Sequence, residues 1–172
     1  MRRAPAAVLV AVLALTACGR ADPPVPHRAW VTNVCQVLKP WRLELEALNR
    51  QTADRMKSAT TPAQAREHLL RLLDQARQVS EAARSGVAGA GVPDVADGVV
   101  IEQRFVDALA GVRDAYGKAH QAVQKLSDDS FYAGVTQAMD TLNQDYARAG
   151  VNTGRLASAD LRKDFDEVPG CG

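Results

Sequence analysis

The sequence has few aromatic residues, almost no excess of charge and only three cysteines in 172 residues. Aromatic residues make up 5% of the chain, and 21 basic side chains are offset by 20 acidic ones, for a formal net charge of +1. Nucleic-acid binding relies on an excess of positive charge gathered on one face, so this balance argues against a nucleic-acid partner. The length and the 47% hydrophobic content predict one globular domain.

Sequence patterns typical of catalytic and cofactor sites are also missing. The chain contains no G-x-S-x-G, no phosphate-binding G-x-x-x-x-G-K and no dinucleotide-binding G-x-G-x-x-G. His27, His68 and His120 lack the spacing of metal ligands, and the surroundings of Asp94 and Asp97 lack that of a calcium loop. We therefore expect solvated histidines, no metal, no cofactor and no catalytic residues. A catalytic triad need not be local in sequence, so a hydrolase stays open as the least favoured alternative.

The first residues have the order of an export signal. Arg2 and Arg3 precede a mostly apolar run, Ala4 to Leu15, which is followed by small residues. A bilayer-spanning helix needs roughly 20 apolar residues, so the run is too short to span, and no second run of this kind follows. We expect residues 1–17 to be removed, which changes the net charge from +1 to −1 by the loss of two arginines.

The end of this segment, Leu15-Thr16-Ala17-Cys18, resembles the lipobox of bacterial lipoproteins. The resemblance implies that Cys18 is thioether-linked to diacylglycerol and becomes the first residue of the mature chain. Two acyl chains, such as palmitate, hold a protein stably on a membrane, whereas one chain holds it only marginally. The resemblance therefore predicts an extracytoplasmic protein that is lipid-anchored to the cell membrane. The alternative is an ordinary signal peptide that happens to contain a cysteine.

Assigning Cys18 to a lipid leaves Cys35 and Cys171, near the two ends of the mature chain. Disulfides persist outside the cytoplasm, and no further thiol competes for the pairing. The closed loop of about 137 residues corresponds to a stabilisation of about 4 to 5 kcal/mol in the chain-entropy model. Metal binding or redox catalysis is the weaker interpretation, because there is no C-x-x-C and no histidine beside either cysteine.

The remainder is expected to be a spacer followed by helices. Residues 18–28 contain three prolines and predict an extended spacer, and residues 29–172 predict the folded domain. Apolar residues recur with helical period in four long segments, 30–56, 62–86, 101–126 and 131–146, with a short helix around Leu161 and Phe165. Pro40 is expected to kink or restart the first helix, and Gly86 to end the second.

Helix starts are predicted from polar side chains at the segment boundaries. Thr61 with Pro62 has the form of a helix start, and Asp97 and Ser127-Asp128-Asp129 offer caps for the third and fourth helices. Four long helices with short connections predict an all-α, antiparallel four-helix bundle. An even number of helices returns the chain to its starting end, where Cys171 can reach Cys35.

Trp30 and Trp41 are eleven residues apart and so lie on one helix face, about 20° from a whole number of turns. With Phe105 they are candidates for the walls of a small apolar ligand site between helices, which would need a cavity of roughly 300 Å³. Core packing is the favoured alternative for these residues.

The domain as a whole looks like the small secreted helical lipoproteins of high-GC Gram-positive bacteria. The resemblance rests on the Trp-x4-Cys-x4-Pro-Trp opening at residues 30–41, the Ala- and Arg-rich helices and the Pro-x-Cys ending at residues 169–171. It implies a location and no catalytic residues. We expect a binding or interaction module of the cell envelope, with a carrier of a small apolar ligand as the alternative.

Overall fold

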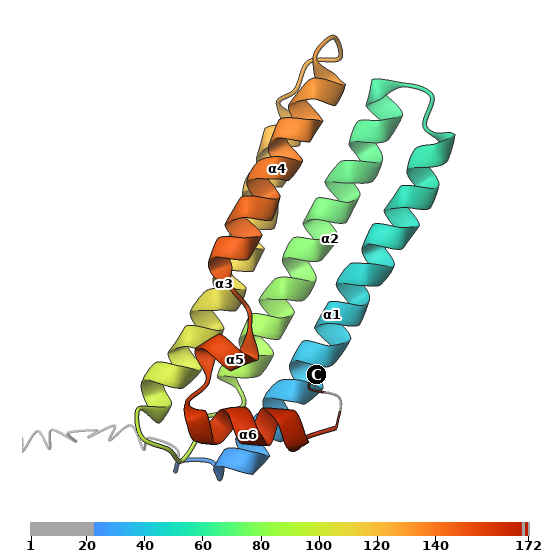
Figure 1. Ribbon diagram of the computed structural model, residues 1–172. Helices are drawn as coiled ribbons and strands as arrows, with labels where there is room; N and C mark the ends of the chain where they lie inside the picture. The colour runs from blue at the N-terminus through green and yellow to red at the C-terminus, as the bar shows by residue number, and fades with distance from the viewer. Residues whose placement is uncertain (1–22, 170, 172) are drawn as a thin grey trace, which may run out of the picture.

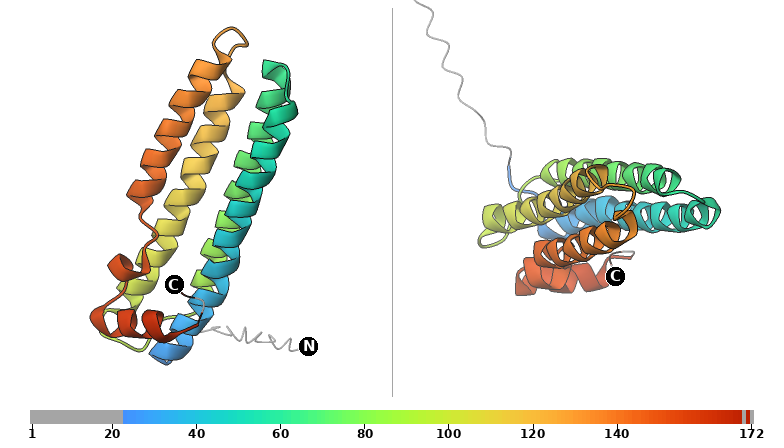
Figure 2. Two further views of the ribbon diagram at one scale, coloured as in Figure 1. Left: turned by 45° about the vertical axis from the view of Figure 1, so that its right-hand side comes forward. Right: turned by 90° about the horizontal axis from the view of Figure 1, so that it is seen from above.

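The computed structural model describes residues 23–169 and Cys171, and it confirms an all-α bundle (Figure 1). Its four long helices are α1 (His27–Ser58), α2 (Pro62–Ala88), α3 (Gly98–Gln124) and α4 (Phe131–Ala149). They run antiparallel, one after another, and two short helices follow, α5 (Thr153–Leu156) and α6 (Ala159–Glu167). Figures 1 and 2 show α6 lying across the base of the bundle, where α1 and α3 begin.

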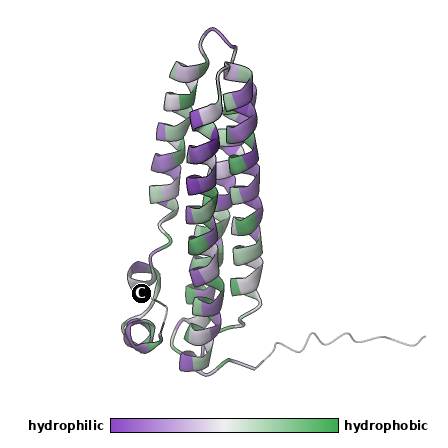
Figure 3. Cartoon of the chain, turned by 90° about the vertical axis from the view of Figure 1, so that its right-hand side faces the viewer, coloured by the Kyte–Doolittle hydropathy of each residue, from purple (hydrophilic) through white to green (hydrophobic). Residues whose placement is uncertain are grey.

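The helices form because each carries an apolar stripe toward its neighbours, and hydrophilic and hydrophobic residues alternate along all of them (Figure 3). α2 packs on both α1 and α3, while α4 packs almost entirely on α3 within the described part of the chain. The inward residues of α4 are consequently less buried than predicted. Phe131 is 1% exposed, but Val135, Met139, Leu142 and Tyr146 are only partly buried.

The predicted disulfide is present and closes the domain. Cys35 on α1 is bonded to Cys171, with 5.1 Å between their Cα atoms. The tail is also held by apolar contacts, because Leu161 and Phe165 of α6 are 0% and 4% exposed. Phe165 stacks on Phe105 of α3 with ring centroids 5.7 Å apart. The predicted return of the tail to the start of the first helix is therefore confirmed.

The predicted spacer is wrong in its last residues, Val25–Arg28. Val25 pairs with the loop before α3, since its amide donates to the carbonyl of Val92 and its carbonyl accepts from the amide of Asp94, both at 2.8 Å. α1 begins at His27, so His27 and Arg28 belong to the bundle. Cys18 and the rest of residues 18–22 lie outside the described residues.

Of the two outcomes expected at Pro40, a kink or a restart, the restart is absent. α1 is continuous through Pro40 to Ser58, and buried side chains on either side, Leu38 and Trp41, hold the helix in the core. α2 continues through Gly86 and ends at Ala88, because Gly86 lies against Val37 of α1, where a Cβ would stand 3.0 Å from a methyl group. Contacts between helices, which a local pattern does not show, explain both corrections.

Of the predicted caps, only one is confirmed. The hydroxyl of Thr61 accepts from the amide of Gln64, with Pro62 at the first helical position. Asp97 precedes α3 in the left-handed region (φ 59°) and its side chain makes no cap hydrogen bond. Ser130 precedes α4, also without a side-chain cap, because Asp128 is instead paired with Arg66 of α2 at 2.7 Å.

Candidate functional site

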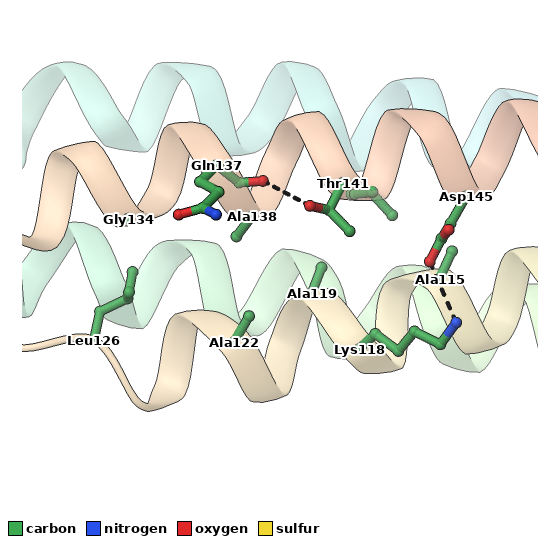
Figure 4. A pocket seen from close by; sticks show the side chains of 11 residues that line it. Ala115, Lys118, Ala119, Ala122, Leu126, Gly134, Gln137, Ala138, Thr141 and Asp145 are labelled. Carbon is green, nitrogen blue, oxygen red and sulfur yellow. Dashed lines mark hydrogen bonds and ion pairs between the residues drawn. The ribbon is translucent and has the colours of Figure 1, made fainter.

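A groove lined mostly by apolar side-chain surface lies between α3 and α4, and we call it the α3–α4 groove (Figure 4). Its volume is about 330 Å³. It is lined from α3 and the turn after it by Ala115, Lys118, Ala119, Ala122 and Leu126, and from α4 by Gly134, Gln137, Ala138, Thr141, Leu142 and Asp145. Both walls belong to adjacent antiparallel helices, so the groove has a rigid frame.

Two close approaches between the helices bound this groove. At one end a Cβ on Gly111 would stand 2.9 Å from that of Ala149, and at the other a Cβ on Gly134 would stand 2.3 Å from a methyl carbon of Leu126. At Gly111 the missing side chain leaves room for the backbone-fixed Cβ of the opposite helix, and at Gly134 it leaves room for the end of the Leu126 side chain. Between the two contacts, small residues, Ala115, Ala119, Ala122 and Ala138, leave a hollow along the seam, and longer side chains border it.

The floor of the groove is apolar and its edges are polar. Ala115, Ala119 and Ala138 are 2%, 4% and 7% exposed. At one end the Asp145 carboxylate accepts from Lys118 Nζ at 3.3 Å and from Arg148 Nη1 at 2.6 Å. With a side chain only 14% exposed, Asp145 offers little charge to solvent. The groove is suited to bind an apolar surface, with orienting polar groups at its rim.

The polar groups of the wall are engaged by their neighbours. Thr141 is the single hydroxyl in the groove wall, and it donates to the carbonyl of Gln137 in its own helix at 3.0 Å. No cysteine, histidine or serine belongs to the wall, and its one carboxylate, Asp145, is paired with Lys118 and Arg148. Across the described residues no group of three His, Cys, Asp or Glu side chains is placed to share a metal ion.

A second, charged pocket of about 480 Å³ lies at the base of the bundle. There the side chain of His27 is 52% exposed, in line with the expectation of a solvated histidine, and in addition its Nδ1 lies 2.5 Å from Asp164 Oδ2. Asp164 is 6% exposed, and Arg28 pairs with Glu167 one turn further along α6 at 3.0 Å. The residues lining this pocket include no serine, threonine or cysteine. Because the His27–Asp164 and Arg28–Glu167 pairs join the first residues of α1 to α6, they dock α6 on α1.

The three aromatic residues proposed as ligand-facing lie in the core. Trp30 and Phe105 are both 0% exposed and pack edge to face, with centroids 5.5 Å apart. The indole N–H of Trp30 donates to the carbonyl of Gly91 at 2.7 Å, and that of Trp41 donates to the Ser80 hydroxyl at 3.1 Å. Trp41 also borders a shallow pocket of about 200 Å³ between α1 and α2. This placement favours core packing over a shared ligand site.

The strongly shifted pKa values lie outside the groove. Hydrogen bonds from Arg84 and then Arg113 lower the pKa of Glu81 to about 2. Because Arg113 belongs to α3, with Nη1 2.7 Å from a Glu81 oxygen, this network joins α2 to α3. Burial, with a smaller contribution from Tyr146, raises the pKa of Tyr116 to about 12. These shifts accompany structural contacts.

The α3–α4 groove was not predicted from the sequence, although a signal for it exists. Gly111, Ala115, Ala119 and Ala122 recur three or four residues apart on α3, so they lie on one face. Such spacing is common in helices that merely pack closely, and only the opposing small residues of α4 turn it into a groove.

Comparisons with known proteins do not assign this chain to a family. No protein-family model, curated protein or solved structure matches it. None of the helices among the described residues is both long and apolar enough to cross a bilayer.

Proposed function

We propose that this protein is a lipid-anchored binding module of the cell envelope, which holds an apolar helical segment of a partner protein in the α3–α4 groove. The observation that carries the proposal is the groove itself, a hollow of about 330 Å³ with a floor of buried alanines on a rigid pair of helices. Amphipathic helices bind in grooves of this kind by placing side chains spaced three or four residues apart.

The dimensions of the groove fit such a segment. From Ala115 to Leu126 it follows α3 for about three turns, or roughly 17 Å at 1.5 Å per residue. A helix of similar length presents three or four apolar side chains to the floor, and the ion pairs of Asp145 lie beside its end. A protein segment uses the whole length, whereas a compact small molecule fills only part of it.

The anchoring part of the proposal is supported by the sequence alone. The lipobox-like Leu15-Thr16-Ala17-Cys18 follows an apolar run with arginines in front of it, and no other segment has the character of an anchor. The disulfide between Cys35 and Cys171 is compatible with an extracytoplasmic location, since such bonds persist there. The resemblance to the small helical lipoproteins of high-GC Gram-positive bacteria agrees with it.

Filling the groove tests the binding role. Ala122 lies at the exposed edge, so Ala122→Trp occupies the hollow with little disturbance of the core, and Ala147→Trp adds the same bulk at an exposed position outside the groove wall. A photo-reactive amino acid at Gln137, in cells producing the full chain, should give one discrete protein adduct. Ala122→Trp should abolish the adduct and Ala147→Trp should leave it. An adduct unaffected by Ala122→Trp would contradict the proposed site.

A carrier of a small apolar ligand is the second candidate, and the volume of the groove favours it. Ligand sites begin at about 300 Å³, which the groove just exceeds. Native mass spectrometry of the protein released from its own membrane in mild detergent distinguishes the two. A reproducible extra mass that disappears on denaturation, and that is absent from Ala122→Trp, would establish the carrier. A bare chain would favour the protein partner.

A further inference from the structure

The base of the bundle exposes a cluster of apolar side chains that no part of the described chain covers. Val99 and Val100, in the first turn of α3, are 65% and 48% exposed. Ala96 is exposed and Val95 is half-buried in the loop directly before them. We call these four residues the basal patch. Only four large hydrophobic residues of the described chain are strongly exposed, and two of them are neighbours here.

The chain enters the bundle beside this patch. Val25 is held between Val92 and Asp94 by two backbone hydrogen bonds of 2.8 Å, in the same loop that leads to Val95 and Ala96. α1 starts two residues later, next to the start of α3 (Figures 1 and 2). The point where the N-terminal segment meets the bundle is therefore fixed close to the exposed valines.

Covalent geometry limits how far this point can lie from a lipid on Cys18. Seven Cα–Cα steps separate Cys18 from Val25, and an extended chain covers at most about 25 Å over that length. α3, with 27 residues, is about 40 Å long, so its far end lies beyond this reach. A lipid anchor keeps the base of the bundle, but not its far end, beside the bilayer.

From these observations we infer that the basal patch is a membrane-docking surface that seats the bundle upright on the bilayer. This inference rests on the proposed lipid anchor and adds to it a second contact with the same membrane. An anchored chain meets the bilayer at a high effective concentration, so two exposed valines suffice to bias its orientation. Each of them gains by leaving water for the acyl and headgroup boundary.

The charges around the patch decide what kind of lipid surface fits it. Arg28 and Lys163 are exposed at this end, and so are the acidic residues Asp94, Asp97, Asp160 and Glu167. Val95 and Ala96 lie at the edge of the charged pocket at the base of the bundle, which α6 also lines. Because charges of both signs surround the valines, the contact does not depend on anionic lipid, and a zwitterionic phosphatidylcholine bilayer is sufficient. An upright bundle would also present the α3–α4 groove outward, since Ala115 lies about 25 Å further along α3 than Val99.

Tryptophan fluorescence of the full lipid-modified chain in phosphatidylcholine vesicles tests this orientation. Val99→Trp places a reporter in the patch, and Tyr132→Trp places one at an equally exposed position, 60%, at the opposite end of the bundle. The fluorescence of the buried Trp30 and Trp41 is measured in the unaltered protein and subtracted. We expect a blue shift for Val99→Trp on addition of vesicles and strong quenching by brominated phosphatidylcholine. Tyr132→Trp should show neither.

A second variant separates the patch from the anchor. With the reporter moved to Ala96→Trp, replacing both Val99 and Val100 by Ser should lower the docked fraction, measured by quenching, roughly tenfold, because two valine burials are lost. Flotation with the vesicles should be unchanged. Because both valines are exposed, the variant should fold, and circular dichroism checks that it does.

The outcomes distinguish failure of this inference from failure of the lipid anchor. If the unaltered chain floats with vesicles and Cys18→Ser does not, the anchor stands. Equal quenching of Val99→Trp and Tyr132→Trp would then overturn the docking surface alone. If neither protein floats, or both float equally, the lipid anchor is wrong and the inference falls with it. Quenching unaffected by the two serines would also contradict the role of the valines.

Discussion

Opening the Cys35–Cys171 disulfide is expected to remove a large part of the stability of the bundle. The bond joins the third turn of α1 to the end of the chain, across 136 positions of sequence. In the chain-entropy model, a loop of that length corresponds to about 5 kcal/mol, because the cross-link removes conformations from the unfolded chain. For a domain of this size that equals a fall in Tm of roughly 10 to 20 °C.

The fold itself should survive the loss of the disulfide, since α6 is held independently. Leu161 and Phe165 are buried, and the ring of Phe165 packs on both Trp30 and Phe105. The His27–Asp164 and Arg28–Glu167 pairs hold the same helix as well, and Asp164 is buried with Leu161 and Phe165. We therefore expect a cooperative transition at lower temperature, with the helical signal at 20 °C retained.

Thermal unfolding followed by circular dichroism measures the effect in the full chain. The Cys35→Ala/Cys171→Ala variant and the unaltered protein treated with a phosphine reductant should shift together, and the reductant should not shift the variant further. A fall in Tm of less than about 2 °C would refute the loop-entropy reasoning. Loss of helix at 20 °C would refute the claim that α6 docks without the bond.

Other expected outcomes concern the helix seam and pH. Gly111→Ala should destabilise the protein by about 1 to 3 kcal/mol in urea unfolding, because its Cβ would stand 2.9 Å from the Cβ of Ala149, and Gly117→Ala, where a Cβ has ordinary room, should stabilise it by about 0.5 to 1 kcal/mol. Since the pKa of Glu81 is lowered to about 2, its pairing stabilises the fold above pH 4.5 and is lost as the pH falls toward 2, so Glu81→Gln should flatten the acid side of the Tm profile. Burial raises the pKa of Tyr116 to about 12, so its contribution is present below pH 10 and lost between pH 10 and 12. Tyr116→Phe should remove that alkaline loss, and an unchanged profile would contradict the assignment.

The helices could be predicted because each depends mainly on its own residues. The apolar stripe of α3, from Ile101 to Val123, follows the helical period without interruption, and all of its main members are buried as expected. Thr61 and Pro62 are local signals as well, and the start of α2 follows them. The incorrect predictions concern residues whose conformation is determined by a contact with another helix. Gly86 remains helical against Val37, and Asp128 turns to Arg66 instead of capping α4.

The candidate site could not be predicted in the same way. The sequence indicates Trp30, Trp41 and Phe105 as candidates because large aromatic rings often line ligand sites, yet in this bundle they pack in or beside the core. The floor of the groove is made instead by alanines, which give a weak signal in any single helix. Nothing in the sequence of α3 alone indicates that Gly111 faces Ala149.

The sequence by itself determined the all-α class, the four long amphipathic helices and the pairing of the only two cysteines outside the export-like segment. The helices follow from the period of the apolar residues and the disulfide follows from the number of cysteines, and both can be read from the sequence alone. The tertiary structure decided which faces meet. It brought His27 to Asp164 across 137 positions, left α4 packed almost entirely on α3 within the described residues and opened a groove between two glycine contacts. The reason is physical: a groove depends on the relative register of two helices, and register is set by packing between residues far apart in the chain.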